Sequence, residues 1–301
     1  MLPLLLLAYA ALGVSGRVTS KACSNIVAAK SNRARYMLYL VLTGIIACFV
    51  FFVKGGFKIG LTANTLAYAA VYALICVLST VCHVTAFQLA NISEVVIFST
   101  FGGLVATSAV GFFGFHEPPE PRALIKIAVM LVATVFSFIE TKRAERDAGS
   151  AKKTRASLKL VLVLILLIVA GSGNVATLKL FGEADGVSDI NSMFFFTNLF
   201  IAAGAAVIFA LTAPKSKNDA ADAFNMLRPL SLLLISTNTA ISNLQSAISA
   251  ELIFLMPVSV YNPVSSAIGV LVGVAASFIY RERHGIFFYL SALVALFAVI
   301  I

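Results

Sequence analysis

The sequence predicts an all-α polytopic membrane protein with ten membrane-spanning helices. Of its 301 residues, 60% are hydrophobic and 12% are charged, about half the charged fraction that is usual in soluble proteins. Long charge-free runs approach or exceed the roughly 20 residues that a helix needs to cross the hydrocarbon core. Helices satisfy their backbone hydrogen bonds internally, which a sheet with open edges cannot do in lipid.

Each span is placed by a charge-free run. The first lies at about residues 2–21 and has no basic stretch ahead of its apolar core, so we interpret it as a span rather than a cleaved signal peptide. Pro118, Pro119 and Pro121 prevent the chain from continuing as one helix between the fourth and fifth spans. The other nine spans are expected at residues 36–53, 64–89, 94–115, 122–140, 160–179, 190–213, 229–249, 252–280 and 286–301.

A polar, basic linker divides the chain into two groups of five spans. Residues 141–159 are charged, lack apolar periodicity and separate residues 1–140 from residues 160–301. Three spacings recur in order in the two groups. The matched features are Gly13 to Lys21 with Gly171 to Lys179, Gln88 to Glu94 with Gln245 to Glu251, and the span ends at Glu117 and Glu282. Because five is an odd number of crossings, we expect two five-helix repeats that are inverted in the membrane.

The charge distribution predicts an orientation. We interpret the net charge of +9 as basic loops rather than a nucleic-acid-binding surface. By our span assignment, 17 of the 22 Lys and Arg residues follow odd-numbered spans. The positive-inside rule then places those loops in the cytoplasm and both termini outside. The prediction is a multi-pass protein of the plasma (inner) membrane.

Many amide and hydroxyl side chains lie at membrane depth, where exposure to lipid is costly. Each such residue either bonds one helix to another or lines a watery cavity, and for the set as a whole we expect a central polar cavity. The candidate lining residues are Tyr261, Asn262, Pro263, Asn238, Asn243, Gln245, His83, Gln88, Asn174, Lys21 and Lys179.

Several of these candidates have a second interpretation. Pro263 removes a backbone donor and frees the carbonyl of Ser259, which could face a substrate or could mark a simple kink. The His83 side chain could relay a proton or make a helix–helix hydrogen bond. Lys21 and Lys179 could attract an anion or form a gate, or their side chains could extend to the membrane surface.

Two glutamates at span ends are candidate gates. Glu117 and Glu282 follow the fourth and ninth spans, where a carboxylate could close a gate through a salt bridge. The alternative is that each one caps a helix or pairs with a neighbouring arginine.

Enzymatic motifs are absent from the sequence. There is no GxSxG, HExxH or P-loop motif. The three histidines are scattered, and the four cysteines do not have the spacing of a zinc site. We therefore expect no catalytic residues, no metal and no cofactor.

Two stretches resemble the EamA-like transporters of the drug/metabolite transporter superfamily. FGGLVATSAVGFFGFHEPPEPRALIKIAVMLVA, residues 101–133, is similar to the fourth and fifth spans of that family. VYNPVSSAIGVLVGVAASFIYRERHGIFFYLSALVALFAVI, residues 260–300, is similar to the ninth and tenth spans. The Gly and Lys of the first and sixth spans are similar too. The resemblance implies a ten-helix bundle with a central cavity and alternating access. Family members usually keep both termini in the cytoplasm, whereas the charges of this chain place them outside.

The expected function is secondary transport of a small polar or amphipathic metabolite. The expected partners are the small-molecule substrate, the lipid bilayer and a coupled proton, and nucleic acid is not among them. Two alternatives stay open at this point. One is a flippase for a lipid-linked sugar or lipid, and the other is a membrane scaffold or sensor without flux, in which the polar residues pair between helices.

Overall fold

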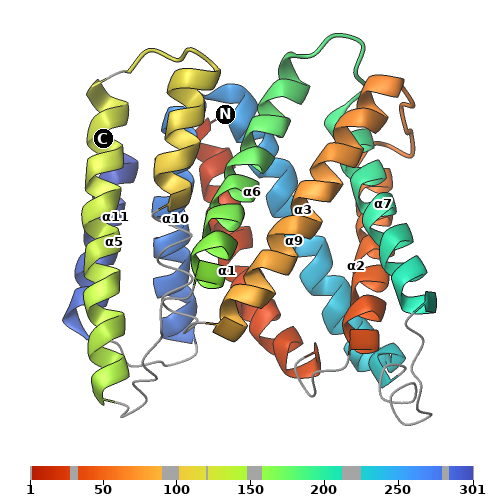
Figure 1. Ribbon diagram of the computed structural model, residues 1–301, viewed down its shortest axis with the longest axis horizontal. Coiled ribbons are helices and arrows are strands. Elements are labelled where there is room, and N and C mark those ends of the chain that lie inside the picture. Colours follow the sequence, from red (N-terminus) through yellow and green to blue (C-terminus); the bar gives the residue numbers. More distant parts are fainter. Residues whose placement is uncertain are drawn as a thin grey trace. The chain divides into compact units, whose positions relative to one another are not determined.

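The computed structural model describes residues 2–27, 33–89, 102–119, 121–147, 158–211, 225–279 and 285–300. These residues form helices and turns, and no strand occurs among them. The nine α-helices with assigned bounds are α1 (Leu2–Val27), α2 (Arg33–Lys54), α3 (Ala63–Leu89), α5 (Pro121–Asp147), α6 (Leu158–Glu183), α7 (Ile190–Leu211), α9 (Pro229–Leu255), α10 (Val258–Ile279) and α11 (Ile286–Ile300) (Figure 1). Residues 102–109 are also helical and continue into the π-helical turn η1 (Val110–Gly114); we call them together the 102–114 helix. A 3₁₀ turn, η2 (Asn225–Leu227), precedes α9.

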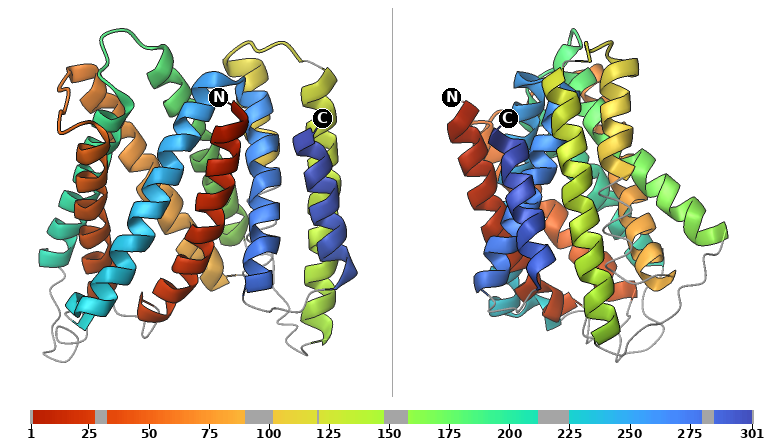
Figure 2. Two further views of the ribbon diagram at one scale, coloured as in Figure 1. Left: turned by 180° about the vertical axis from the view of Figure 1, so that it is seen from behind. Right: turned by 90° about the vertical axis from the view of Figure 1, so that its left-hand side faces the viewer.

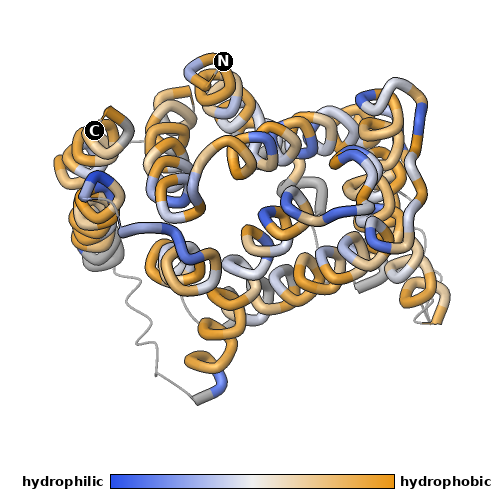
Figure 3. The backbone as a smooth tube through the Cα atoms, turned by 90° about the horizontal axis from the view of Figure 1, so that it is seen from above, coloured by the Kyte–Doolittle hydropathy of each residue, from blue (hydrophilic) through white to orange (hydrophobic). Residues whose placement is uncertain are grey.

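The described helices are mostly apolar (Figure 3). Five are long and apolar enough to cross a membrane, at Tyr36–Lys54, Pro121–Glu140, Lys159–Glu183, Ile190–Leu211 and Val258–Ala276. Four shorter apolar helices lie at Leu2–Gly16, Ala63–Ser79, Gly102–Gly114 and Ile286–Ala298. Helix α9 belongs to neither group, although it is 27 residues long. The prediction of an all-helical, apolar fold is confirmed, and these helices are compatible with an integral membrane protein.

Several predicted boundaries move, and the ninth span, expected from residue 252, begins as α10 only at Val258. The eighth span was expected to end at residue 249, but α9 continues to Leu255, so Glu251 lies inside it. Only Met256 and Pro257 separate α9 from α10, because a proline at this point cannot continue the ladder of helical hydrogen bonds. The first residues of the predicted linker, 141–147, continue α5 into the polar region, since their lysine, arginine, alanine and glutamate side chains favour a helix.

The chain divides into two compact units. Unit 1 comprises Pro3–Ala73 and Phe181–Ala250, and unit 2 comprises Leu74–Leu180 and Glu251–Ile301. Each unit therefore contains residues from before and from after the predicted linker. Helices α3, α6 and α9 each begin in one unit and end in the other.

In unit 1, α2 packs antiparallel to α7. The rings of Phe51 and Phe194 stack with their centroids 4.9 Å apart, and the thiol of Cys48 donates to the carbonyl of Phe195 at 3.4 Å. Gly44, which precedes Cys48 by about one turn of α2, lies against Ala202, which follows Phe195 on α7. Residue numbers decrease along α2 in the direction in which they increase along α7, so the two helices are antiparallel. The contact depends on the absence of a side chain at Gly44.

Polar contacts in unit 1 join the region between α2 and α3 to the region between α6 and α7. The hydroxyl of Thr65, in the first turn of α3, lies 2.9 Å from that of Ser188 in the turn after α6. The N–H of Gly60, in the turn after α2, donates to the hydroxyl of Ser192 in the first turn of α7 at 2.9 Å. The starts of α3 and α7 therefore lie on the same side of this unit.

The carboxylate of Asp189 caps the start of α7. It accepts hydrogen bonds from the N–H groups of Asn191 and Ser192 at 2.9 and 3.1 Å, and from the Ser192 hydroxyl. Burial by itself raises the pKa of this carboxyl. The hydrogen bonds from Ser192 and Asn191 together outweigh burial, and the pKa of Asp189 is lowered from its ordinary value.

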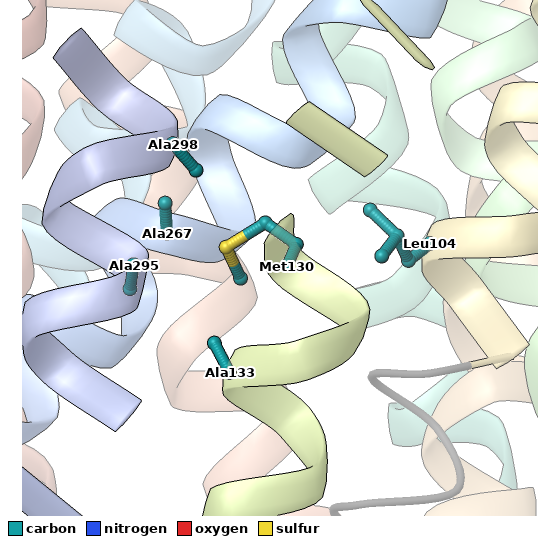
Figure 4. Packing of buried hydrophobic residues seen from close by; sticks show 6 residues of the cluster. All are labelled: Leu104, Met130, Ala133, Ala267, Ala295 and Ala298. Atoms are coloured by element: carbon teal, nitrogen blue, oxygen red, sulfur yellow. The ribbon is translucent and has the colours of Figure 1, made fainter. Parts of the chain in front are cut away.

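In unit 2, α5, α10 and α11 enclose a small apolar core (Figure 4). Met130 of α5 is fully buried among alanines of all three helices. Helix α11 lies beside α5 in the opposite direction (Figure 2), and the Ser291 hydroxyl donates to the carbonyl of Ala133 at 2.8 Å. The small side chains let the backbones approach closely. The cluster comprises Leu104, Met130, Ala133, Ala267, Ala295 and Ala298.

Adding one methyl group at Gly44 should separate α2 from α7. A Cβ at Gly44 would lie 2.7 Å from the Cβ of Ala202 and 3.0 Å from the carbonyl oxygen of Asn198, whereas one at Gly204 would meet nothing within 4 Å. We expect Gly44→Ala to lower the unfolding temperature in detergent, followed by circular dichroism. Gly204→Ala, on the facing helix, should leave it unchanged or raise it, since alanine favours a helix by about 0.5–1 kcal/mol. Equal effects of the two substitutions would contradict this packing.

The capping role of Asp189 predicts a pH dependence of stability. A carboxyl with a lowered pKa stabilises the fold above the pKa of the unfolded chain, and that contribution is lost as the pH falls through the folded pKa. Asp189→Asn should therefore lower the unfolding temperature at pH 7, and its difference from the natural protein should shrink as the pH falls below about 4. A difference that is constant from pH 7 to pH 3 would show that the charge of Asp189 does not matter.

Candidate functional site

Helix α9 has two chemically different faces. Leu230, Leu233 and Leu244 are exposed and, at about 100° per residue, lie within about 60° of one another around the helix. Ser246 is also exposed, yet it lies on the opposite side, about 140–160° from the leucines. Its hydroxyl donates to the carbonyl of Ser242 at 3.0 Å. Helix α9 thus has one exposed side that carries these leucines and Thr237, which is also exposed, and an opposite side on which Ser246 is exposed.

The polar face of α9 is bound to α1. The hydroxyl of Thr19 donates to the Oδ1 atom of Asn238 at 2.9 Å, and the Cys23 thiol donates to the carbonyl of Leu234 at 3.3 Å. Tyr39 of α2 is also hydrogen-bonded to the Asn238 side chain. Asn238, a predicted cavity residue, is 7% exposed and joins three helices of unit 1.

The other predicted residues of α9 lie on the same half of the helix. The amide of Asn243 donates to the carbonyl of Thr239, one turn earlier, at 2.8 Å. Gln245 lies close to Gly16 of α1, where a Cβ would be 3.7 Å from its Oε1 atom. Thr239 is 4% exposed, and its buried hydroxyl has no hydrogen-bond partner among the described residues.

In unit 2, Asn262 joins α10 to the 102–114 helix. Its Nδ2 atom donates to the carbonyls of Gly103 and Leu104 at 3.1 and 3.2 Å. Carbonyls only accept, so the nitrogen rather than the oxygen of the amide must face them. Tyr261 and Pro263 beside it are buried, and Pro263 lies inside α10, where it leaves the carbonyl of Ser259 without its usual helical donor.

Glu117 caps the first turn of α10. The N–H groups of Val258 and Ser259 donate to its two carboxylate oxygens at 2.6 and 2.8 Å. The start of a helix has unpaired N–H groups and a positive dipole end, so a carboxylate is a favourable partner there. The capping alternative for Glu117 is what the structure shows.

The position of the Glu117 carboxylate against α10 depends on the unusual turn that precedes it. The π-helical turn η1 closes with the N–H of Phe115 donating to the carbonyl of Val110 at 3.1 Å, and His116 follows with a φ of 51°. At Gly111 a Cβ would lie 2.6 Å from the Glu117 carboxylate and 2.9 Å from the nitrogen of Ser259. Only glycine leaves room for the carboxylate to reach α10 at this point.

A second carboxylate of unit 2, that of Glu140, bonds to the backbone at the start of another helix. Glu140 accepts a hydrogen bond from the N–H of Gly285, immediately before α11. Its other carboxylate oxygen is buried and has no hydrogen-bond partner among the described residues. Sequence reasoning missed Glu140, although it is the first charge after the apolar run of α5.

Helix α6 carries the remaining described candidates. The Cys76 thiol of α3 lies 3.7 Å from the Oδ1 atom of Asn174, to which it donates. Lys179 is half-buried near the end of the same helix. Glu282 lies outside the described residues, and so do the side chains of Lys21, His83 and Gln88.

The structure thus brings the candidates together in two groups. Asn238, Asn243 and Gln245 share one half of α9 in unit 1, and Tyr261, Asn262, Pro263 and Glu117 meet at the start of α10 in unit 2. Sequence reasoning missed Thr19, Tyr39 and the backbone acceptors of Asn262, because residue type alone does not tell which helices are neighbours. Among the described residues, no cluster of three or more His, Cys, Asp and Glu side chains could hold a metal ion.

Comparisons with known proteins identify the fold and not a family. No family model matches the chain, and no curated protein matches it. A solved structure titled "Crystal structure of protein" is similar to 98% of this chain over 94% of its own length, with a TM-score of 0.60 and 12% sequence identity. The chain therefore has an all-helical fold that also occurs in a solved structure, along nearly its whole length.

The Glu117 cap predicts unequal effects of alanine substitutions at Gly111 and at Gly103. Gly111→Ala would push the carboxylate away from α10, whereas a Cβ at Gly103 would meet nothing within 4 Å. We expect Gly111→Ala and Glu117→Ala each to destabilise the protein by about 2–4 kcal/mol, because hydrogen bonds to a charged group contribute about 1.5–3 kcal/mol each. Glu117→Gln should cost less, and Gly103→Ala little. Unfolding temperatures in detergent would measure this, and an unchanged value for Glu117→Ala would refute the cap.

Proposed function

We propose that this chain is a secondary transporter that moves a small polar or amphipathic metabolite across a membrane by alternating access. It would be an integral membrane protein of ten spans, arranged as two inverted five-helix repeats, and would resemble the EamA-like members of the drug/metabolite transporter superfamily. The observation that carries the proposal is the two-faced helix α9, with exposed leucines on one side and an exposed serine on the other.

A helix like α9 is hard to explain by contact with lipid alone. Its leucine face suits the hydrocarbon of a bilayer. Its opposite half carries Asn238, Thr239, Asn243, Gln245 and Ser246, and exposing so many amides and hydroxyls to lipid would be costly. Because Ser246 is exposed on that half, we infer that it faces water inside the bundle. A water-filled path lined by neutral polar groups is what a metabolite transporter requires.

The helix pairs support the inverted repeat. If residues 1–140 and 160–301 are repeats, α2 corresponds to α7, α5 to α11 and the 102–114 helix to α10. Each of these pairs is in contact: α2 with α7 and α5 with α11, and the 102–114 helix with α10 through Asn262 and through Glu117, which follows that helix. Helix α10 also packs against α5 and α11. An in-plane two-fold axis would place such counterparts side by side and antiparallel, as inverted repeats in transporters do.

In this proposal Glu117 belongs to a gate. Its cap holds the start of α10 against the 102–114 helix, next to the two-residue break at Met256 and Pro257. Breaking this contact would let α10 move while α9 stays in place. A coupled proton is the expected driving ion, and the excess of basic residues after odd-numbered spans favours an orientation with both termini outside.

A scaffold or sensor without flux is the second candidate. Its specific support is that several polar side chains bond helix to helix: Thr19 with Asn238, Thr107 with Ser172, and Asn262 with two backbone carbonyls. That is how polar groups behave in a closed, dry bundle. The two candidates differ in whether the polar half of α9 meets water.

Thiol labelling would decide between them. In a variant whose four native cysteines are replaced, Ser246→Cys should react with a water-soluble maleimide in intact membranes, because the thiolate that reacts forms only in water. Leu244→Cys and Leu233→Cys, on the apolar face of the same helix, should react at least tenfold more slowly. Equal and slow labelling at all three positions would favour the scaffold.

Flux through purified protein is the direct test of function. Proteoliposomes that contain the protein should take up or exchange at least one metabolite from a panel of sugars, nucleosides, amino acids and organic cations, faster than empty liposomes. If folded protein with a labelled Ser246→Cys shows no flux across the whole panel, the transport proposal fails while the water-facing surface of α9 stands.

A further inference from the structure

Several hydroxyl side chains inside the helices bond to their own backbone. Five described serines and threonines donate to the carbonyl four residues earlier, at distances of 2.8 to 3.0 Å. This local bond is a common way for a helical hydroxyl to be satisfied. The five are Ser15, Thr85, Thr134, Thr177 and Ser246.

Thr107 and Ser108 depart from this pattern. The carbonyls four residues before them are those of Gly103 and Leu104. The amide of Asn262 occupies both. The Thr107 hydroxyl instead donates to the Ser172 hydroxyl at 3.1 Å. The Ser108 hydroxyl is buried, in a residue that is 3% exposed, and has no partner among the described residues.

We propose that Thr107 and Ser108 are positioning residues whose hydroxyls donate to the carbonyls of Gly103 and Leu104 whenever Asn262 does not. In the described state the Asn262 amide donates to both carbonyls and so joins α10 to the 102–114 helix. When α10 moves away, rotation about one side-chain bond brings each hydroxyl onto its own carbonyl. Each carbonyl thus keeps a second donor, besides its helical N–H, in both states.

This exchange lowers the cost of separating the two helices. Breaking the Asn262 contact without a substitute would leave two additional carbonyl lone pairs unpaired in an apolar region, which is unfavourable. Ser108 supplies one of the missing donors and gains the partner that it lacks among the described residues while Asn262 is bound. Thr107 supplies the other by exchanging its bond to the Ser172 hydroxyl for one to its own carbonyl. The state in which Asn262 is bound therefore already contains the two hydroxyls that can bond to these carbonyls once α10 has moved away.

The inference deepens the proposed function, because alternating access requires α10 to move against the 102–114 helix. The exchange itself is a property of the fold and can be tested without any substrate. Its failure is therefore distinguishable from a failure of the transport proposal, which is decided by labelling and flux.

A double-mutant cycle of thermal unfolding tests the exchange. Ser108→Ala alone should leave the unfolding temperature unchanged or raise it by about 2 °C, because it removes a buried hydroxyl without a partner. In the Asn262→Leu background the same Ser108→Ala should lower the unfolding temperature by about 2 °C, because Ser108 then holds the carbonyl of Leu104. The change of sign between the two backgrounds is the expected result.

Two controls come from the same chain. Thr239→Ala removes another buried hydroxyl without a partner, on a helix that Asn262 does not bond, and should have the same effect in both backgrounds. Asn198→Leu removes an amide that, among the described residues, bonds to its own helix at the Phe194 carbonyl, and should leave the effect of Ser108→Ala unchanged. Circular dichroism of detergent-solubilised full-length protein is the measurement.

An additive cycle, with the same shift for Ser108→Ala in both backgrounds, would overturn the proposal. If Asn262→Leu does not fold, Asn262→Ala removes the same two donors with a smaller disturbance of packing and gives the same comparison. A sign change that also appears with Thr239→Ala would equally overturn it, because the effect would then not be specific to the carbonyl of Leu104.

Discussion

The need to satisfy backbone groups at a break between two helices governs the start of α10. Pro257 ends the hydrogen-bond ladder of α9, and the next helix begins with N–H groups that have no helical partner. In water such groups bond to solvent, but next to apolar helices they require a protein acceptor. Glu117 supplies it with both carboxylate oxygens. The break, the glycine at 111 and the π-helical turn η1 form one arrangement, because each is needed for the carboxylate to reach α10.

The same solution appears at the start of α11. Glu140 of α5 accepts from the N–H of Gly285, so the two last helices of the chain each begin at a carboxylate that comes from the first half. Both caps lie in unit 2 and both join segments that are more than one hundred residues apart in the sequence. Such caps are charge-assisted hydrogen bonds, which are stronger than neutral ones.

Residue types and charge-free runs were sufficient to predict the helices and to single out Asn238, Asn262 and Glu117. Their partners could not be predicted in the same way. The acceptors of Asn262 are main-chain carbonyls, which every residue possesses, and the donor to Asn238 comes from Thr19, a residue that the search for costly polar groups had passed over. The boundary at residue 249 was wrong because a charge was taken as the end of a span, although Glu251 is accommodated inside α9. The two faces of α9, by contrast, were predictable, because a rotation of about 100° per residue separates Ser246 from the leucines on the sequence alone.

The π-helical turn has a consequence for how this chain tolerates changes in length. A π-turn closes with an i→i+5 hydrogen bond and so contains one residue more than the corresponding turn of α-helix. Loss of a single residue between Val110 and Gly114 would let the turn close as regular α-helix in place of the bond from Phe115 to Val110, and would shorten by one residue the segment that carries Glu117 to α10. Single-residue deletions, which are usually harmless in a polar connection, would thus disconnect α10 here without altering one side chain of the contact.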